Sequence, residues 1–157
     1  MSRERSYEVR AIGTVRGGRG EPVDDGWAAV ESRIELDPEV LEEAAARGLD
    51  SFSHVDVVYV FDRVDPGSVC TGARRPRGRA DWPSVGILAQ RAKDRPNRIG
   101  VSTCELRGVR WPVLEVRGLD AVDGTPVLDV KPHVSGFVPK GAVREPGWAK
   151  ELMAGYW

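Results

Sequence analysis

The sequence is poor in the residues that build metal sites, because its 157 residues include only two cysteines and two histidines. Cys70 and Cys104 lie far apart and form no Cys-x-x-Cys pair. A structural zinc site usually needs about four such ligands in a cluster, so we expect no bound metal and two free thiols. His54 opens an apolar stretch, which favours a structural role for this side chain.

Long apolar runs are also missing. None approaches the roughly 20 residues that a membrane-spanning helix needs. No apolar segment follows the charged start of the chain (MSRERSYEVR), as it would in a secretory signal. We therefore expect a cytoplasmic protein without membrane association. With 41% hydrophobic and 30% charged residues, the chain suits one domain with a sizeable core.

Several catalytic patterns are absent as well. No regular alternation of strands and helices, no GxGxxG and no Walker motif is present, which argues against a doubly wound nucleotide-binding fold. No pair of carboxylates stands in contrasting surroundings, so a hydrolase of that type is not favoured. Ser102 and Cys104 have no evident partner base, so we expect no nucleophilic catalysis from them.

The net charge of −1 conceals an uneven distribution. Residues 21–50 hold ten acids and two bases, whereas residues 72–98 hold eight bases and two acids. The basic segment can meet phosphate or another anion. It can equally face the acidic segment, within one chain or across a dimer. The composition leaves both interpretations open.

Most of the periodic segments show the alternation that is typical of strands. We predict strands at residues 7–15, 28–36, 54–61, 85–89, 100–109, 113–119 and 126–130. Helices are predicted only from Asp37-Pro38 to Gly48 and at residues 148–154, and residues 65–83 are expected to form a long loop. This pattern predicts a mainly β fold, a small antiparallel β-barrel with one or two short helices and long irregular loops.

The charged, proline- and glycine-containing composition of residues 90–102 (QRAKDRPNRIGVS) favours a ligand-binding loop over a core element. Four cations fall within eight residues: Arg91, Lys93, Arg95 and Arg98. Pro96 restricts the turn, and Gly100 permits a close backbone approach. An arginine fork binds a carboxylate or a phosphate at two points. The alternative is a solvated basic turn that ends a strand.

A second such segment spans residues 119–132 (LDAVDGTPVLDVKP). Asp120 and Asp123 bracket a turn, and their carboxylates can accept hydrogen bonds from a ribose diol, from an amine or from the turn backbone. Asp129 and Lys131 follow, and they can pair with each other. His133 comes directly afterwards and is a candidate general base.

Together these segments resemble the signatures of the TrmO (TsaA-like) family of S-adenosylmethionine-dependent methyltransferases. The family pattern ATRSPxRPNPIGxS is matched at residues 89–102, and LDxxDGTPxxDxKP is matched in full at residues 119–132. An FSH strand motif is matched at residues 52–54. The resemblance extends from Ile12 to His133, which is most of the chain.

The resemblance implies one TsaA-like barrel domain over residues 1–157, with its core at 8–133 and a C-terminal extension at 134–157. It also implies a homodimer whose loops bind S-adenosylmethionine, and which methylates the exocyclic amine of a modified adenosine beside the tRNA anticodon. The cofactor-binding positions that it implies are Phe61, Asp62, Arg63, Arg91, Arg95, Asn97, Ile99, Val101, Asp120, Asp123, Gly124 and Thr125. The candidates for contact with the substrate are Arg74, Arg75, Arg77, Arg79 and Lys131. Asp129 and His133 are the only candidates for a catalytic base.

Three departures from the family pattern fall on loops. Arg98 replaces a proline, Asp62-Arg63 replaces His-Gln, and the acidic residues 22–27 (PVDDGW) replace a Pro-Arg-Gln-like element. They bear on the methyl acceptor more than on the cofactor. Two alternatives therefore stand beside tRNA methylation. One is a methyltransferase that acts on a small metabolite, and the other is a nucleic-acid-binding module without chemistry, based on residues 72–98 and Trp82.

Overall fold

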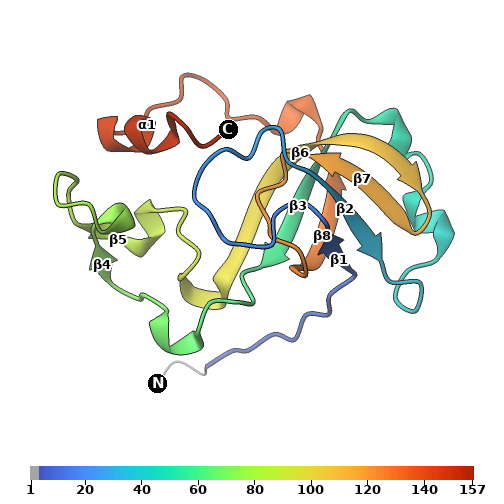
Figure 1. Cartoon of the computed structure of the whole chain (residues 1–157), viewed down its shortest axis with the longest axis horizontal. Coiled ribbons are helices and arrows are strands. Elements are labelled where there is room, and N and C mark those ends of the chain that lie inside the picture. Colours follow the sequence, from blue (N-terminus) through green and yellow to red (C-terminus); the bar gives the residue numbers. More distant parts are fainter. Residues whose placement is uncertain (1–3) are drawn as a thin grey trace.

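Six antiparallel strands form a closed barrel in this computed structural model, which describes residues 4–157. Around the barrel the strands are β1 (Gly13–Arg16), β2 (Glu31–Leu36), β7 (Val113–Arg117), β6 (Ile99–Arg110), β3 (His54–Val60) and β8 (Pro126–Pro132). Closure leaves no unpaired strand edge. The expected mainly β barrel is confirmed (Figure 1). The predicted domain begins at residue 1, but residues 1–3 lie outside the described part of the chain.

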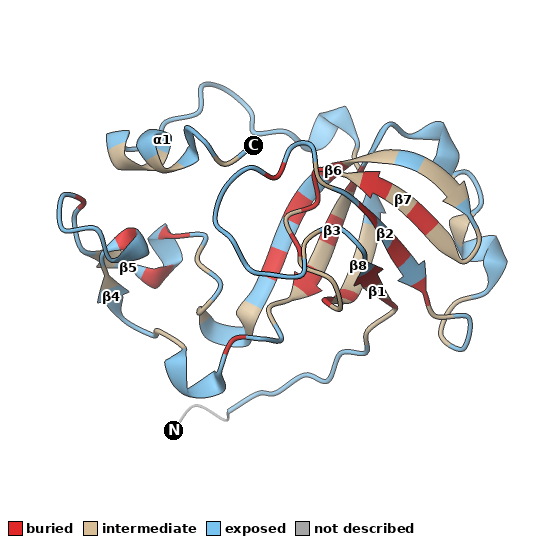
Figure 2. Cartoon of the chain, viewed as in Figure 1, coloured by how far each residue is buried: buried red, intermediate tan, exposed pale blue. Residues whose placement is uncertain are grey.

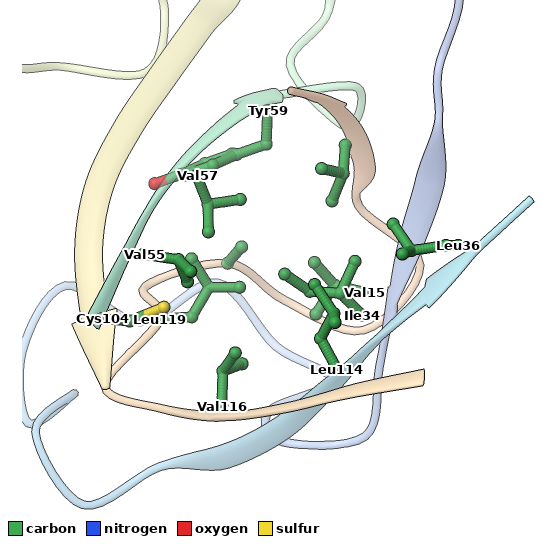
Figure 3. Close-up of a cluster of buried hydrophobic side chains, with 12 residues drawn as sticks. Val15, Ile34, Leu36, Val55, Val57, Tyr59, Cys104, Leu114, Val116 and Leu119 are labelled. Carbon is green, nitrogen blue, oxygen red and sulfur yellow. The ribbon is translucent and has the colours of Figure 1, made fainter. Parts of the chain in front are cut away.

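The core fills the inside of the barrel because alternate residues of each strand point inward. In β2, Ser32, Ile34 and Leu36 are buried while the residues between them are exposed. Figure 3 shows apolar side chains from several strands pointing toward one another. Val55, Val57 and Tyr59 contribute from β3. Figure 2 shows the same alternation as bands of buried and exposed residues along the strands. Packing of this kind is the main stabilising contribution in a small barrel.

The antiparallel order brings three long connections to one end of the barrel. These are residues 17–30 between β1 and β2, residues 61–98 between β3 and β6, and residues 118–125 between β7 and β8. We call this the loop end. The opposite end carries residues 37–53 and the short β6–β7 connection. Leu119 and Ala121 are buried, so the 118–125 segment covers the core at the loop end.

A side lobe stands beside the barrel and consists of residues 62–98 together with α1 (Gly147–Met153) (Figure 1). Its strands β4 (Ala73–Arg74) and β5 (Val85–Gly86) form a two-stranded sheet. Trp82 is buried beneath α1, with its ring centroid 6.4 Å from that of Trp148 and its Nε1 donating to Glu151 Oε2 at 2.8 Å. The lobe also contains the single-turn 3-10 helices η3 (Pro66–Ser68), η4 (Pro76–Gly78), η5 (Ile87–Ala89) and η6 (Pro96–Arg98). The loop expected at residues 65–83 is therefore folded around a buried tryptophan.

Three predicted elements were wrong in extent or type. The helix expected after Asp37 is replaced by turns and two 3-10 helices, η1 (Glu43–Ala46) and η2 (Leu49–Ser51). The Asp37 side chain does accept from the Glu39 amide at 2.9 Å, as at a helix start, but residues 37–50 bury no continuous face that would sustain a helix. The strand expected at residues 7–15 is confined to β1, and the strand expected at 85–89 is confined to β5.

The remaining elements lie close to their expected places. α1 falls within one residue of the predicted helix at 148–154, and η7 (Ser135–Phe137) precedes it. β6 is longer than predicted and bends, because its first half pairs with β3 and its second half pairs with β7. Within residues 4–157, no helix combines the length and the hydropathy that crossing a bilayer requires.

Candidate functional site

The first signature (residues 89–102) folds against the end of β3. The Phe61 amide donates to the Arg98 carbonyl at 2.8 Å, and β6 begins at the next residue. A Cβ at Gly100 would lie 2.6 Å from the Tyr59 ring and 2.8 Å from the Phe61 ring. Glycine is therefore required here by the two aromatic rings, which reach across the backbone of the first signature.

The first signature contains a turn at Asn97-Arg98, and Arg98 is the residue that replaces the family's proline. Asn97 and Arg98 have φ angles of 63° and 50°. Proline is locked near −65°, so Arg98 adopts a backbone conformation that the usual proline cannot adopt. The Arg98 guanidinium donates to the Val64 carbonyl at 2.7 Å, which holds the turn on the side lobe. The substitution therefore accompanies a local change of backbone.

The second signature is tied to the other two connections of the loop end. Asp123 Oδ1 accepts from the Gly17 amide at 2.9 Å. Arg63 donates to the Gly20 carbonyl at 2.6 Å and to the Asp123 carbonyl at 3.2 Å. A single side chain from residues 61–98 thus joins the 17–30 and 118–125 connections. Three segments that lie far apart in the sequence form one surface, as the two signatures led us to expect.

At the centre of this surface, three hydroxyl groups converge on the Asp120 carboxylate. Tyr59 donates to Oδ1 at 3.0 Å, and Ser102 donates to the same oxygen. Tyr156, near the end of the chain, donates to Oδ2. Ser102 and Tyr59 are almost fully buried, whereas Asp120 and Tyr156 are half-buried. The cluster is therefore a partly enclosed anionic site at the mouth of the barrel.

The electrostatics of the cluster keep its phenols protonated. Burial, and next the Asp120 charge, raise the pKa of Tyr59 and likewise the pKa of Tyr156 well above the ordinary value. The Arg91 guanidinium lies near enough to oppose both shifts. At neutral pH the tyrosines are therefore donors, and the two phenols that bind Asp120 have a cation within electrostatic range.

Two arginines of the first signature were candidates for anion recognition, and the structure distinguishes them. The Arg95 guanidinium is half-buried and donates to the Gln90 carbonyl. Arg91 is exposed and donates one hydrogen bond, from Nη2 to the Val101 carbonyl at 2.7 Å. Because Val101 precedes Ser102, this contact places Arg91 beside the Asp120 cluster. Arg91 keeps donors that can face a ligand, while Arg95 shapes the loop.

The other predicted cofactor positions line the same end. Phe61, Asp62 and Arg63 follow β3 there, and Gly124 and Thr125 end the 118–125 connection. Ile99 and Val101 lie at the start of β6 on its outer face. Thr125 is buried and donates to the Val122 carbonyl at 2.7 Å, so its hydroxyl holds the turn. Asn97 stands in the left-handed turn described above.

Three candidates lie away from this surface. β8 carries the chain from the loop end to the opposite end, a rise of about 20 Å at roughly 3.3 Å per residue. Asp129 Oδ2 pairs with Lys131 at 2.7 Å on the outside of this strand. His133 lies beyond the strand and contacts Asp56 at 3.1 Å. Within one chain, neither candidate base stands beside Asp120, so their catalytic role stays a prediction.

The arginines nominated for substrate contact are all engaged inside the chain. Arg74 forms a two-point pair with Asp94, and Arg79 pairs with Asp81. Arg77 donates to Asp25 at 2.9 Å, and its Nε lies 3.9 Å from Asp24. Arg75 donates to the backbone carbonyls of Ala80 and Trp82. Of the two interpretations of the basic segment, contact with the acidic segment within one chain is thus realised at Arg77.

Sequence reasoning missed the hydroxyl groups around Asp120. Tyr59 and Ser102 were read as ordinary strand residues, although their inward position follows from the same alternation that predicted the strands. Tyr156 carried no signal, because only the tertiary path of the C-terminal segment brings it to the barrel. The same holds for Arg19, which stacks 4.6 Å from the Trp27 ring.

The thiols and histidines form no further centre in the described residues. Within residues 4–157, no three His, Cys, Asp or Glu side chains are grouped to hold a metal ion. Both cysteines are free, and burial raises the pKa of Cys104 to about 12, with Asp120 and Asp56 adding to the shift. A thiol with so high a pKa is a poor nucleophile at neutral pH.

Residues 18–137 match the model of the tRNA-methyltransferase O N-terminal domain. The chain belongs to this family. It is 34% identical over 140 residues to the tRNA (adenine(37)-N6)-methyltransferase of Escherichia coli, covering 82% of this chain and 58% of that protein. It is 36% identical over 132 residues to a probable S-adenosyl-L-methionine-binding protein of Methanothermobacter thermautotrophicus, covering 80% of this chain and 88% of that protein.

The fold agrees with the family assignment. A crystal structure of TrmO from Pseudomonas aeruginosa superposes with a TM-score of 0.73 at 30% identity, covering 92% of this chain and 63% of that one. The human tRNA (adenine(37)-N6)-methyltransferase is 33% identical over 104 residues. These cover 66% of this chain and only 23% of the human protein, so the chain spans a minor part of some relatives.

Proposed function

We propose that this protein is an S-adenosylmethionine-dependent methyltransferase whose site is the loop end of the barrel. The observation that carries the proposal is the juxtaposition of Asp120 and Arg91 where both family signatures meet. The names of the Escherichia coli and Methanothermobacter relatives support the same chemistry. The enzyme class and the cofactor both rest on this site together with these relatives.

The residues fit this cofactor by their charges. The amino-acid end of S-adenosylmethionine carries one carboxylate and one ammonium group. Arg91 supplies a fork for the carboxylate, and Asp120 supplies a hydrogen-bond acceptor for the ammonium group. Phe61, whose ring lies next to Gly100, adds apolar surface. The pair thus recognises a zwitterion, and Asp123 and Arg63 fix the loops around it.

The protein's task in such a reaction is mainly positioning. The bound cofactor supplies an activated methyl group and its own leaving group. The loop end must then hold an acceptor amine about 3–3.5 Å from the methyl carbon and in line with the breaking bond. A general base would add only about 10²–10⁴-fold. Because Asp129 and His133 lie elsewhere in the chain, we assign the rate mainly to positioning and leave the proton to solvent.

For the methyl acceptor we propose the amine at N6 of the adenosine beside the tRNA anticodon. The acidic loop at residues 22–27 is no obstacle to an RNA, because Arg77 partly neutralises Asp24 and Asp25. Lys93 is an exposed cation of the first signature without a described carboxylate partner in residues 4–157, and it can face phosphate. The four arginines at 74–79 act on RNA chiefly by shaping the lobe.

Calorimetric titration with S-adenosylmethionine tests the cofactor. We expect binding by the wild-type protein and a loss of about 10- to 100-fold in affinity for Arg91→Ala, because a charged hydrogen-bonding partner is removed. Arg107→Ala is the matched control, since Arg107 is an exposed arginine of β6 that pairs only with Glu105, at 3.3 Å. No binding by the folded wild-type protein would refute the proposed activity.

Transfer of a radiolabelled methyl group to tRNA tests the acceptor. We expect labelling at the adenosine beside the anticodon, and weaker transfer as salt rises. Cofactor binding without any labelling of tRNA would favour the small-metabolite alternative, and salt-sensitive RNA binding without cofactor binding would favour the nucleic-acid module.

The homodimer and the cytoplasmic location belong to this proposal as well. Light scattering in solution tests whether the protein is a dimer.

A further inference from the structure

The C-terminal segment returns from the side lobe to the barrel. After α1, residues 154–157 run back to the connection between β1 and β2. The Gly26 amide donates to the Gly155 carbonyl at 3.0 Å, and the Trp27 amide donates to the Tyr156 carbonyl at 2.9 Å. Trp27 is buried, so this pairing is anchored on the barrel side. The segment is therefore seated, although neither family signature includes it.

This seating brings Tyr156 to the Asp120 carboxylate from the side opposite to the strands. Ser102 of β6 and Tyr59 of β3 both donate to Oδ1, whereas Tyr156 donates to Oδ2. A carboxylate offers about four acceptor positions, so three hydroxyl donors fix its orientation and leave room for a further donor. Without Tyr156, the described contacts of Oδ2 would end, and the carboxylate would be held at one oxygen only.

Helix α1, which precedes residues 154–157, is held on the side lobe. Trp82 binds Glu151 of α1 through its indole N–H at 2.8 Å, and it packs near Trp148. The segment therefore spans from the side lobe, which carries the first signature, to the 17–30 connection. It links two of the three connections that form the loop end, and its side chain at 156 reaches the third at Asp120.

We propose that residues 154–157 form a wall of the ligand site and that Tyr156 is a positioning residue that holds Asp120 toward the amino group of the ligand. The inference rests on the proposed function and deepens it, because it assigns one end of the cofactor to a contact built by the C-terminal segment. Tyr156 acts through Asp120. The raised pKa of its phenol keeps the hydroxyl a donor throughout the physiological range.

The experiment compares two ligands on two variants. Tyr156→Phe removes the hydroxyl but keeps the ring, which packs edge-on against Trp157 at 4.9 Å. Tyr7→Phe is the matched control, because Tyr7 is 81% exposed and lies outside the site. The ligands are S-adenosylmethionine and methylthioadenosine, which lacks the amino-acid end. Calorimetry gives both affinities, and thermal unfolding verifies that each variant is folded.

The expected result is a loss of about tenfold in the affinity of Tyr156→Phe for S-adenosylmethionine, with little change for methylthioadenosine. Tyr7→Phe should bind both ligands as the wild type does. An equal loss for both ligands would indicate a purely structural role and would overturn the inference. Unchanged affinity would overturn it too, and tighter binding would show instead that the segment blocks the site.

The same data separate this inference from the proposed function. If the wild-type protein does not bind S-adenosylmethionine, the proposed function fails and the inference fails with it. If the wild type binds and Tyr156→Phe retains its discrimination between the two ligands, only the inference fails. A chain ending at Met153 serves as the second variant, and it should show at least the loss seen for Tyr156→Phe.

Discussion

The two ends of the barrel carry similar chemistry but differ in how it is assembled. At the loop end, Asp120 is surrounded by donors from β3, β6 and the C-terminal segment, with Arg91 beside it. At the opposite end, His133 pairs with Asp56, and a groove of about 450 Å³ is lined mostly by apolar side chains of residues 36–52 and β8. Both ends therefore contain acids and polar side chains.

The difference between them is where the polar groups meet. At the opposite end, Asp56 faces outward from β3 and accepts from Thr103, its cross-strand neighbour, and from His133 just beyond β8. Asp129 pairs there with Lys131, two residues further along β8. At the loop end, by contrast, two inward-facing strand residues and Tyr156 meet on Asp120 at the mouth of the barrel. A partly enclosed carboxylate held by several donors is the stronger candidate for a binding site. Substitutions at the two ends of the barrel and in the side lobe test this contrast.

The largest effect is expected for Asp120→Asn. Removing the charge leaves three hydroxyl donors facing a neutral amide and removes the proposed acceptor for an ammonium group. We expect a loss of about 100-fold in affinity for S-adenosylmethionine. Asp129→Asn makes the same chemical change at a carboxylate of the second signature that lies away from the loop end, and titration should show affinity close to that of the wild type. Equal losses would abolish the contrast between the two ends.

Gly100→Ala should destabilise the fold directly. The new methyl group would lie 2.6 Å from the Tyr59 ring, and that ring cannot retreat into a filled core. Overpacking of this kind costs about 1–3 kcal/mol. Gly86→Ala is the control, because a Cβ there meets nothing within 4 Å. Chemical unfolding of both variants measures the difference, and a stable Gly100→Ala protein would show that the aromatic contact is loose.

The pair of Arg74 and Asp94 should stabilise the side lobe in a pH-dependent way. Burial tends to raise the pKa of Asp94, but the hydrogen bonds and charge of Arg74 outweigh this and lower it. A lowered pKa in the folded state contributes stability above about pH 4, which is lost as pH falls through the folded value.

Asp94→Asn tests this dependence. Because Arg74 is partly exposed, we expect a loss of at most about 1 kcal/mol at pH 7. The gap to the wild type should narrow as the pH falls below about 4, and urea unfolding across this range measures it. Asp81→Asn is the control, since Asp81 pairs with Arg79 in solvent. A gap independent of pH would mean that packing, and not charge, holds Asp94.

The smallest effect is expected for His133→Ala. The imidazole lies at the opposite end of the barrel, where its Nδ1 contacts Asp56 at 3.1 Å and the His133 amide donates to the His54 carbonyl at 3.0 Å. We expect methyl transfer within about twofold of the wild type and a similar pH profile. A large fall in rate would return His133 to the site and would point to a contribution from a second copy of the chain.

Much of this architecture could be predicted from local pattern. The β-branched and aromatic composition of residues 54–61 and the alternation in residues 113–119 predicted β3 and β7 to within two residues, because each inward side chain is apolar. The predicted helix after Asp37 does not form, although its first turn has suitable capping chemistry. Only separate side chains such as Leu41 and Leu49 pack against the core there, and no continuous face does. Local propensity describes how a helix begins, and tertiary contacts decide whether it continues.

The site was predictable in the same uneven way. Arg91 and Asp120 belong to dense polar segments that stand out in the sequence. Tyr59 was concealed inside an ordinary strand pattern, and Ser102, the last residue of the first signature, was interpreted as a strand residue without a partner. Tyr156 depends on the path of residues 134–157, which no periodicity encodes. Composition could not predict that the basic loop pairs with Asp25, Asp81 and Asp94, because a count of charges does not show which of them are in contact.

Hydrogen exchange with and without S-adenosylmethionine tests the central claim most directly, because it reports on both ends of the barrel in one experiment. The account predicts slower exchange on ligand addition at residues 61–63, 98–102, 118–125 and 154–157, and no change at residues 37–53 or 132–134. Protection at the opposite end, or no protection anywhere at saturating ligand, would contradict it.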